Sequence, residues 1–140
     1  MSVELVFLDT NILVYAHDSS AGSKHAIAHQ LIETCWQTGL GCLSLQVLQE
    51  FYVNITQKVA RPLECSTARQ LVADLSKWRL HIPAANDLLG AIDLQQIYWL
   101  SFWDAMVLQS ATAIGCKKLF SEDLSHGQQY GKVQVLNPFQ

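Results

Sequence analysis

Short apolar runs alternate with amphipathic stretches along the chain, and this alternation predicts strands followed by helices. Apolar runs predict strands over residues 3–8, 41–45, 80–82, 118–120 and 133–136. Apolar residues at helical spacing predict helices over residues 24–38, 48–59, 64–78, 86–98 and 101–114, and a helical run over 12–15 follows the first strand. Gly39 is the expected end of the helix over 24–38, because glycine readily adopts the left-handed conformation found there.

Strands that alternate with helices imply parallel crossover connections. The pattern therefore predicts an α/β fold, a three-layer sandwich with a five-stranded parallel sheet flanked by helices. In such sheets the functional crevice lies beyond the carboxyl ends of the strands, where the strand order reverses. Acidic residues that directly follow strands are therefore the first candidates for chemistry.

Two aspartates stand next to predicted helix starts. Asp9 ends the first strand, and either an N-cap or a functional carboxylate explains it equally well. Asp104 lies in an almost wholly apolar helix, where Ser101 and Asp104 form an S-x-x-D capping pattern. A carboxylate among bulky apolar residues is costly to bury unless a cation compensates it, which slightly favours a functional role for Asp104.

Two further acids are weaker candidates when taken singly. Asp123 follows the fourth strand, where a solvated loop or a turn cap is the simpler interpretation. Glu50 falls away from the apolar stripe of its helix, so a solvated glutamate is the default. Together, however, the four acids have the distribution expected of one pocket. Carboxylates that share a pocket must raise their pKa values or recruit cations, and oxygen-only ligands suit Mg²⁺ or Mn²⁺ better than zinc.

Composition and charge limit the kinds of protein that the sequence can encode. The 140 residues are half hydrophobic and only 15% charged, which predicts one compact domain over residues 1–140. The net charge of −3 argues against a broad basic surface for nucleic acids, although metal ions could supply positive charge locally. A basic leader and a membrane-length apolar run are both missing, so we expect a cytoplasmic protein.

Other motifs have plainer interpretations. Four irregularly spaced cysteines predict reduced thiols rather than disulfides or a zinc site; they are Cys35, Cys42, Cys65 and Cys116. His25 and His29 lack the glutamate of a zinc-protease motif and predict a surface pair. The four tryptophans, Trp36, Trp78, Trp99 and Trp103, are expected in the core or an interface rather than as base-stacking platforms. A haloacid-dehalogenase-like phosphotransferase needs a second acid where Asn11 stands.

Four segments, in order, resemble the motifs of the PIN-domain family. They are Phe7-Leu8-Asp9-Thr10-Asn11, the helix with Glu50, Ser101-Phe102-Trp103-Asp104-Ala105 and Phe120-Ser121-Glu122-Asp123-Leu124. The resemblance covers nearly the whole chain and is closest to the VapC-like toxins of toxin–antitoxin systems. It implies a five-stranded parallel sheet, a Mg²⁺- or Mn²⁺-dependent endoribonuclease acting on RNA, a homodimer, and an antitoxin protein that occludes the active site.

The resemblance also implies roles for individual residues. Asp9 and Asp104 would be direct metal ligands, and Glu50 would be a ligand or would position water through one. Asp123 would complete the acidic ring, with Ser121 orienting it by a hydrogen bond. These four acids are the expected catalytic residues.

The sequence leaves some details of the site open. Asn11 would steady Asp9 from outside the ligand set, and either Glu122 or Asp123 could face the metal. Candidate phosphate contacts, for which solvated surface is the simpler interpretation, are Lys58, Arg61, Lys117 and Lys118. Hydrolysis by activated water would leave 5′-phosphate and 3′-hydroxyl ends. The alternative is a catalytically silent PIN-like binding module that acts through a protein partner.

Overall fold

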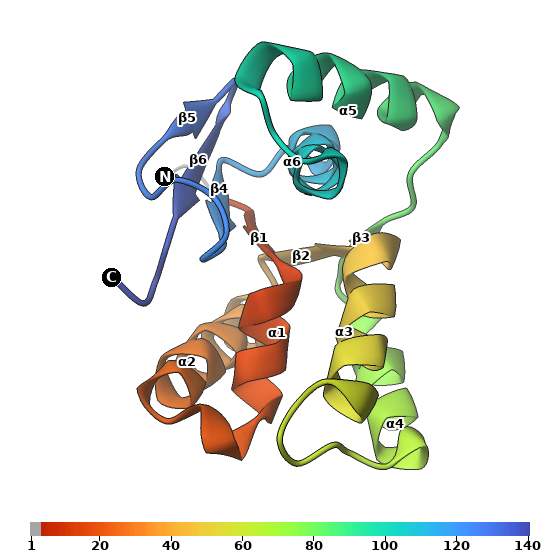
Figure 1. The fold of residues 1–140 in the computed structure, drawn as a ribbon, viewed down its shortest axis with the longest axis vertical. Helices are drawn as coiled ribbons and strands as arrows, with labels where there is room; N and C mark the ends of the chain where they lie inside the picture. Colours follow the sequence, from red (N-terminus) through yellow and green to blue (C-terminus); the bar gives the residue numbers. More distant parts are fainter. Residues whose placement is uncertain (1–3) are drawn as a thin grey trace.

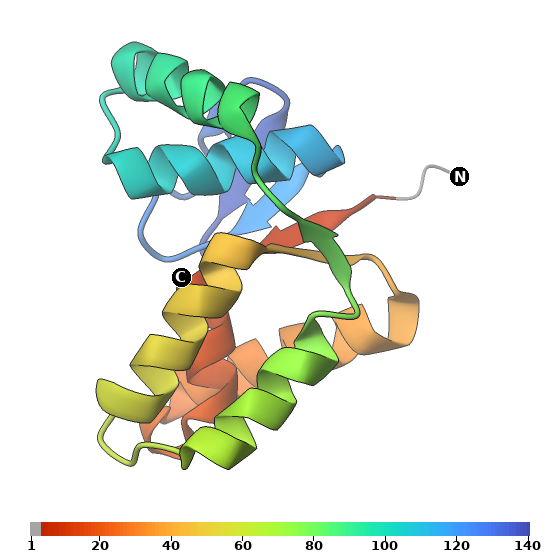
Figure 2. The same ribbon diagram turned by 90° about the vertical axis from the view of Figure 1, so that its right-hand side faces the viewer.

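The computed structural model describes residues 4–140, so Val3, where the first strand was expected to begin, lies outside the described residues. The described part is an α/β fold with helices on both faces of a mostly parallel sheet (Figures 1 and 2). In chain order its elements are β1 (Val6–Leu8), α1 (Thr10–His17), the 3₁₀ helix η1 (Ser19–Ala21), α2 (Ser23–Thr38), β2 (Gly41–Ser44), α3 (Leu45–Gln57), α4 (Cys65–Leu75), β3 (Arg79–His81), α5 (Ala85–Tyr98), α6 (Phe102–Ile114), β4 (Lys118–Phe120), β5 (Gln129–Tyr130) and β6 (Val133–Leu136).

The predicted fold class is confirmed, and the strand count differs by one. Within residues 4–140 the sheet has six strands in the order β3-β2-β1-β4-β6-β5. Five of them run parallel to one another, and β5 pairs antiparallel with β6. The sequence pattern missed β5 because two residues are too few to establish a periodicity.

The helices cover the sheet unequally. Helix α6 lies against one face with α5 packed on its outer side, while α1 to α4 cover the other face (Figures 1 and 2). Helix α6 is therefore enclosed between the sheet and α5, which explains its apolar sequence. Its first turns bury Ala105, Met106, Val107 and Leu108 beside the carboxylate of Asp104.

Most predicted helix boundaries agree with the structure to within a few residues. Helix α2 ends at Thr38 and is capped by Gly39, whose φ of 69° is the left-handed conformation expected there. A helix was expected over residues 64–78, but the observed helix, α4, is shorter and ends at Leu75. The helical run expected over 12–15 belongs to an eight-residue helix, α1. None of the helices in residues 4–140 combines the length and apolar character needed to cross a bilayer.

The carboxyl ends of β1 and β4 lie side by side in the sheet. The chain passes from β1 to β2 and β3 on one side, and only afterwards returns to β4 on the other side of β1. The strand order thus reverses between β1 and β4, and this is the place where a parallel sheet opens a crevice. Asp9 follows β1 directly, and the segment from Ser121 to Asp123 follows β4 directly.

Candidate metal centre

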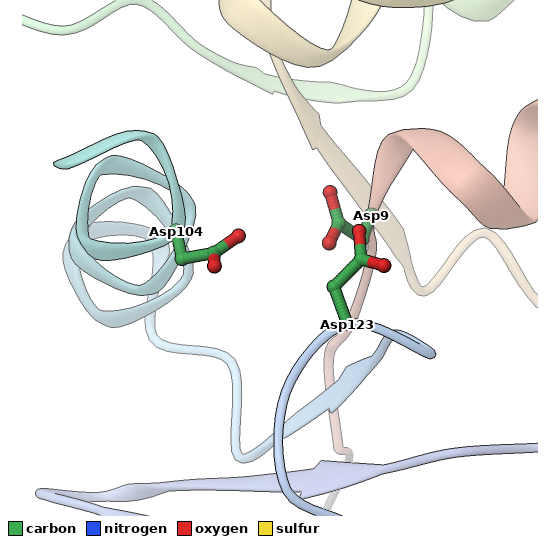
Figure 3. A group of neighbouring side chains, drawn as sticks. All are labelled: Asp9, Asp104 and Asp123. Carbon is green, nitrogen blue, oxygen red and sulfur yellow. The ribbon is translucent and has the colours of Figure 1, made fainter. Parts of the chain in front are cut away.

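Three aspartates from distant parts of the chain converge at this edge of the sheet (Figure 3). Asp9 follows β1, Asp104 lies in the first turn of α6, and Asp123 lies in the loop after β4. One carboxylate oxygen from each aspartate lies within 4.8 Å of the other two. The carboxylates face a common space, with Asp104 on one side and Asp9 and Asp123 on the other (Figure 3).

Asp9 is the buried member of the group, with 5% of its surface exposed. It is the N-cap of α1, so its Oδ1 accepts a hydrogen bond from the Thr10 amide at 2.7 Å, and its Oδ2 accepts one from Ser121 Oγ at 2.7 Å. Burial raises the pKa of Asp9 from 3.8 to about 7; these two hydrogen bonds oppose the rise, and the carboxylates of Asp123 and Asp104 add to it. The Asp9 side chain therefore caps α1 and also belongs to the acidic cluster.

Asp104 is half-buried at the start of α6. Its amide donates to Ser101 Oγ at 3.2 Å, which makes Ser101 the N-cap that the sequence pattern predicted. Burial is the main cause that raises the pKa of Asp104; hydrogen bonding to Ser101 lowers it, and the carboxylates of Asp123 and Glu50 raise it further. The apolar surroundings and the neighbouring acids therefore both disfavour a negative charge on Asp104 when no cation is present.

Asp123 is exposed, and hydrogen bonds link its loop to the other acids. Asn11 Nδ2 donates to Asp123 Oδ2 at 3.0 Å, and the Asp123 amide donates to Ser121 Oγ at 3.1 Å. Ser121 thus holds the Asp123 amide, as the resemblance implied, but its hydroxyl also donates to Asp9, whereas Asn11 contacts Asp123 rather than Asp9. The reason is the parallel pairing of β1 with β4, which places fully buried Ser121 beside Asp9 and leaves Asn11 to face Asp123.

Glu122 lies next to Asp123 in sequence and turns to different partners. Tyr15 Oη donates to Glu122 Oε1 at 2.6 Å, and Lys24 Nζ forms an ion pair with Glu122 Oε2 at 2.8 Å. These contacts anchor the loop to α1 and α2. The sequence left open whether Glu122 or Asp123 would face a metal. In the structure the carboxylate of Asp123 lies with those of Asp9 and Asp104.

Glu50 lies outside the three-aspartate group but lines the same cleft. Its Oε2 accepts a hydrogen bond from Thr10 Oγ1 at 3.2 Å, and its Oε1 accepts one from Gln46 Nε2 at 2.7 Å. Glu50 is half-buried rather than the solvated glutamate that helix periodicity predicted. The packing of α3 against α1 turns this side of α3 towards the cleft, which a helical wheel of α3 alone cannot reveal.

The cleft has a volume of about 490 Å³, and residues that sequence reasoning did not assign to a site also line it. Among them are Gln46, Asn54 and Trp103. Lys58, which the sequence offered as a candidate phosphate contact, also lines the cleft. Trp103 is 63% exposed, Trp99 92% and Trp36 45%, so a core location is wrong for these three. Unlike the acids, Trp103 carried no sequence signal beyond its position next to Asp104.

The donor set suits a hard divalent cation. All of the converging side chains present carboxylate oxygens, which Mg²⁺ and Mn²⁺ prefer over the nitrogen and sulfur ligands typical of zinc. Three carboxylates this close repel one another, and a divalent cation would relieve that repulsion. The four cysteines are free thiols and do not belong to this group of ligands; Cys65 is exposed and the others are buried.

Comparisons with known proteins identify a matching family and similar folds. The sequence profile of the PIN domain matches residues 6–130. A toxin–antitoxin complex from Klebsiella pneumoniae contains a chain with a similar fold, at 20% identity and a TM-score of 0.71, over 96% of this chain and 98% of that one. VapC20 of Mycobacterium tuberculosis, a toxin that cleaves the sarcin–ricin loop, is similar at 19% identity and a TM-score of 0.63, over 84% and 91% of the two chains.

A third similar structure is VapBC2 from Rickettsia felis, bound to a DNA fragment from the promoter, at 18% identity and a TM-score of 0.62, over 94% of this chain and 96% of that one. No curated protein matches the sequence significantly. The structural likenesses concern the fold, whereas the profile match spans most of the chain. The chain therefore belongs to the PIN domain family.

Proposed function

We propose that this chain is a metal-dependent endoribonuclease, the toxin of a toxin–antitoxin pair, which acts on RNA in the cytoplasm. The observation that carries the proposal is the convergence of Asp9, Asp104 and Asp123 within 4.8 Å, at the reversal of strand order. Membership of the PIN family and the fold shared with toxin structures support the same conclusion.

The three aspartates would hold a Mg²⁺ or Mn²⁺ ion. When bound, such a cation supplies positive charge that stabilises the negative charge developing on the phosphate during hydrolysis. The protein itself contributes ligand orientation. The amide of Thr10 and the hydroxyl of Ser121 each hold one oxygen of Asp9, and both hydrogen bonds favour its ionised form.

Glu50 has a separate role at the cleft wall. The hydrogen bonds from Thr10 and Gln46 hold its carboxylate in place, and a carboxylate so held can orient the attacking water. Water as the nucleophile predicts products with a 5′ phosphate and a 3′ hydroxyl. Lys58, which lines the same cleft, would contact the phosphate backbone of the substrate.

The test is cleavage of a mixed RNA pool with Mg²⁺ or Mn²⁺ and with EDTA. We expect cation-dependent cutting that Asp104→Asn abolishes and Glu33→Gln leaves intact, since Glu33 is an exposed acid on α2 outside the cleft. Ends that carry 2′,3′-cyclic phosphate would refute attack by water. A folded, metal-loaded protein that cuts no RNA would favour the alternative, a silent binding module that acts through a protein partner.

We further propose that the protein forms a homodimer through α5 and that an antitoxin protein covers the cleft. Large apolar side chains are exposed on α5, namely Leu88, Leu89, Ile92 and Ile97. Exposed apolar patches commonly mark protein interfaces. Leu89→Asp should yield monomers in sedimentation experiments, whereas Ile27→Asp, at an exposed apolar position on α2, should not. Unchanged sedimentation of Leu89→Asp would exclude this interface.

A further inference from the structure

A second hollow adjoins the cleft that holds the acids. It also measures about 490 Å³, and the two hollows share several lining residues, namely Gln46, Glu50, Asn54, Lys58 and Trp103. Because they share these walls, the two hollows form one continuous depression that leads away from the aspartates. We call this depression the α3 groove.

One wall of the α3 groove is a polar stripe along α3. Gln46, Glu50, Asn54 and Lys58 follow one another at intervals of four residues, so they lie on the same face of the helix. The stripe begins beside the acids and ends at Lys58, the C-cap of α3. From Glu50 to Lys58 the helix rises about 12 Å, at 1.5 Å per residue.

Lys58 gives the far end of the groove a positive charge. It is the one cationic residue among those that line the two hollows, and it forms no ion pair within residues 4–140. Its ammonium group is therefore available to a phosphate. The amide side chains of Gln49 and Asn54 can both donate and accept hydrogen bonds, as the edges of bases require.

Trp103, in the first turn of α6, also lines both hollows. It directly precedes Asp104 in sequence, is 63% exposed, and its carbonyl oxygen accepts a hydrogen bond from Gln46 Nε2 at 3.4 Å. The ring of Phe102 packs against it edge to face, with centroids 4.9 Å apart and an interplanar angle of 77°. An exposed indole next to a proposed catalytic acid offers a flat surface on which an unpaired base can stack.

We propose that a single-stranded RNA segment next to the scissile phosphate lies in the α3 groove, with one unpaired base on Trp103 and a phosphate on Lys58. This inference rests on the proposed function. A base inside a duplex already stacks on its neighbours and cannot reach the indole, so the groove selects unpaired nucleotides. Since the chain has a net charge of −3 and the groove one lysine, stacking rather than counterion release supplies most of this subsite's affinity.

The stacking part is tested by the affinity for an unstructured, fluorescently labelled RNA oligonucleotide, measured by anisotropy in EDTA so that no cleavage occurs. Trp103→Ala should weaken binding roughly 10-fold or more, and Trp103→Phe should recover most of the loss because it keeps an aromatic face. Trp99→Ala is the matched control, since Trp99 is 92% exposed and lines neither hollow. The same RNA in duplex form should bind more weakly and should not respond to Trp103→Ala.

The phosphate part is tested by the salt dependence of the same affinity. Lys58→Ala should reduce the slope of log Kd against log salt concentration by roughly 0.7, the value for one contact to a single strand. Lys132→Ala is the control, because Lys132 is exposed and lines neither hollow. An unchanged slope in Lys58→Ala would remove Lys58 from the proposal.

Different results separate this inference from the proposed function. If the wild-type protein cuts no RNA with either Mg²⁺ or Mn²⁺, the proposed function fails, while the anisotropy experiment still decides whether RNA uses the groove. If the wild type cuts RNA and Trp103→Ala binds RNA as well as Trp99→Ala does, the groove proposal is wrong and the nuclease stands. A change in oligomeric state in place of RNA affinity would assign Trp103 to a protein interface and overturn the proposal. Mn²⁺ affinity, measured by calorimetry, should be unchanged by Trp103→Ala.

Discussion

Replacing Asp9 by asparagine should stabilise the metal-free protein at the same time as it removes the function. The Asp9 carboxylate is buried, and its pKa is raised from 3.8 to about 7 when no cation is bound. The folded state therefore holds a proton that the unfolded chain releases, so the free energy of unfolding falls as the pH rises from about 4 to about 7. At about 1.4 kcal/mol for each unit of pKa, the full loss amounts to about 4 kcal/mol at pH 8.

Asparagine has no charge to desolvate, but it cannot accept both hydrogen bonds that Asp9 accepts. One of the bonds from Thr10 and Ser121 is lost, at a cost of about 2 kcal/mol for a bond to a charged group. The net expectation is that Asp9→Asn unfolds with a free energy about 2 kcal/mol higher at pH 8. At pH 5 folded Asp9 keeps its proton while the unfolded chain has largely released its own, so only about 2 kcal/mol of the loss has accumulated. The lost hydrogen bond offsets this amount, so the gain should vanish at pH 5.

Urea unfolding in EDTA, followed by tryptophan fluorescence at pH 5 and pH 8, measures both values. Added Mn²⁺ should reverse the ranking at pH 8, because a ligand at 100 times its Kd stabilises the wild type by about 2.7 kcal/mol and binds the variant poorly. Asp123→Asn is the control, since Asp123 is exposed and its replacement should change the metal-free stability little. A variant less stable than wild type in EDTA at pH 8, or equally stabilised at both pH values, would refute the reasoning.

Three further predictions concern the orientation of Asp9, the protonation of Asp9 and the packing around Gly41. Ser121→Ala removes the hydroxyl that orients Asp9 and should weaken Mn²⁺ binding roughly 10- to 100-fold in calorimetry; unchanged affinity would show that the hydrogen bond does not matter for the metal. Metal affinity of the wild type should fall by about 10-fold for each pH unit below 7, because the cation must displace the proton of Asp9, and a flat profile from pH 5 to 8 would contradict the raised pKa. Gly41→Ala would place a Cβ 2.6 Å from the ring of Trp78 and 2.8 Å from Cys35 Cβ, which should lower the free energy of unfolding by about 1–3 kcal/mol; an unchanged urea midpoint would show that the ring yields freely.

Local patterns in the sequence were sufficient for the α/β class and for most of the elements. Buried strands such as β1 and helices such as α2 differ in the period at which apolar residues recur, and that period is a property of each segment alone. The positions of Asp9 and Asp123 directly after strands predicted that they would lie near each other, because parallel strands end at one edge of a sheet.

Tertiary packing decided which side chains meet. Glu50 faces the cleft because α3 packs on α1, and Ser121 contacts Asp9 because β4 pairs with β1. Trp103 lies exposed on a groove wall, although its apolar neighbours in the sequence suggested a core or interface position. The periodicity of a segment defines its own faces, whereas the orientation of each face depends on contacts between segments far apart in the chain, and those contacts exist only in the folded molecule.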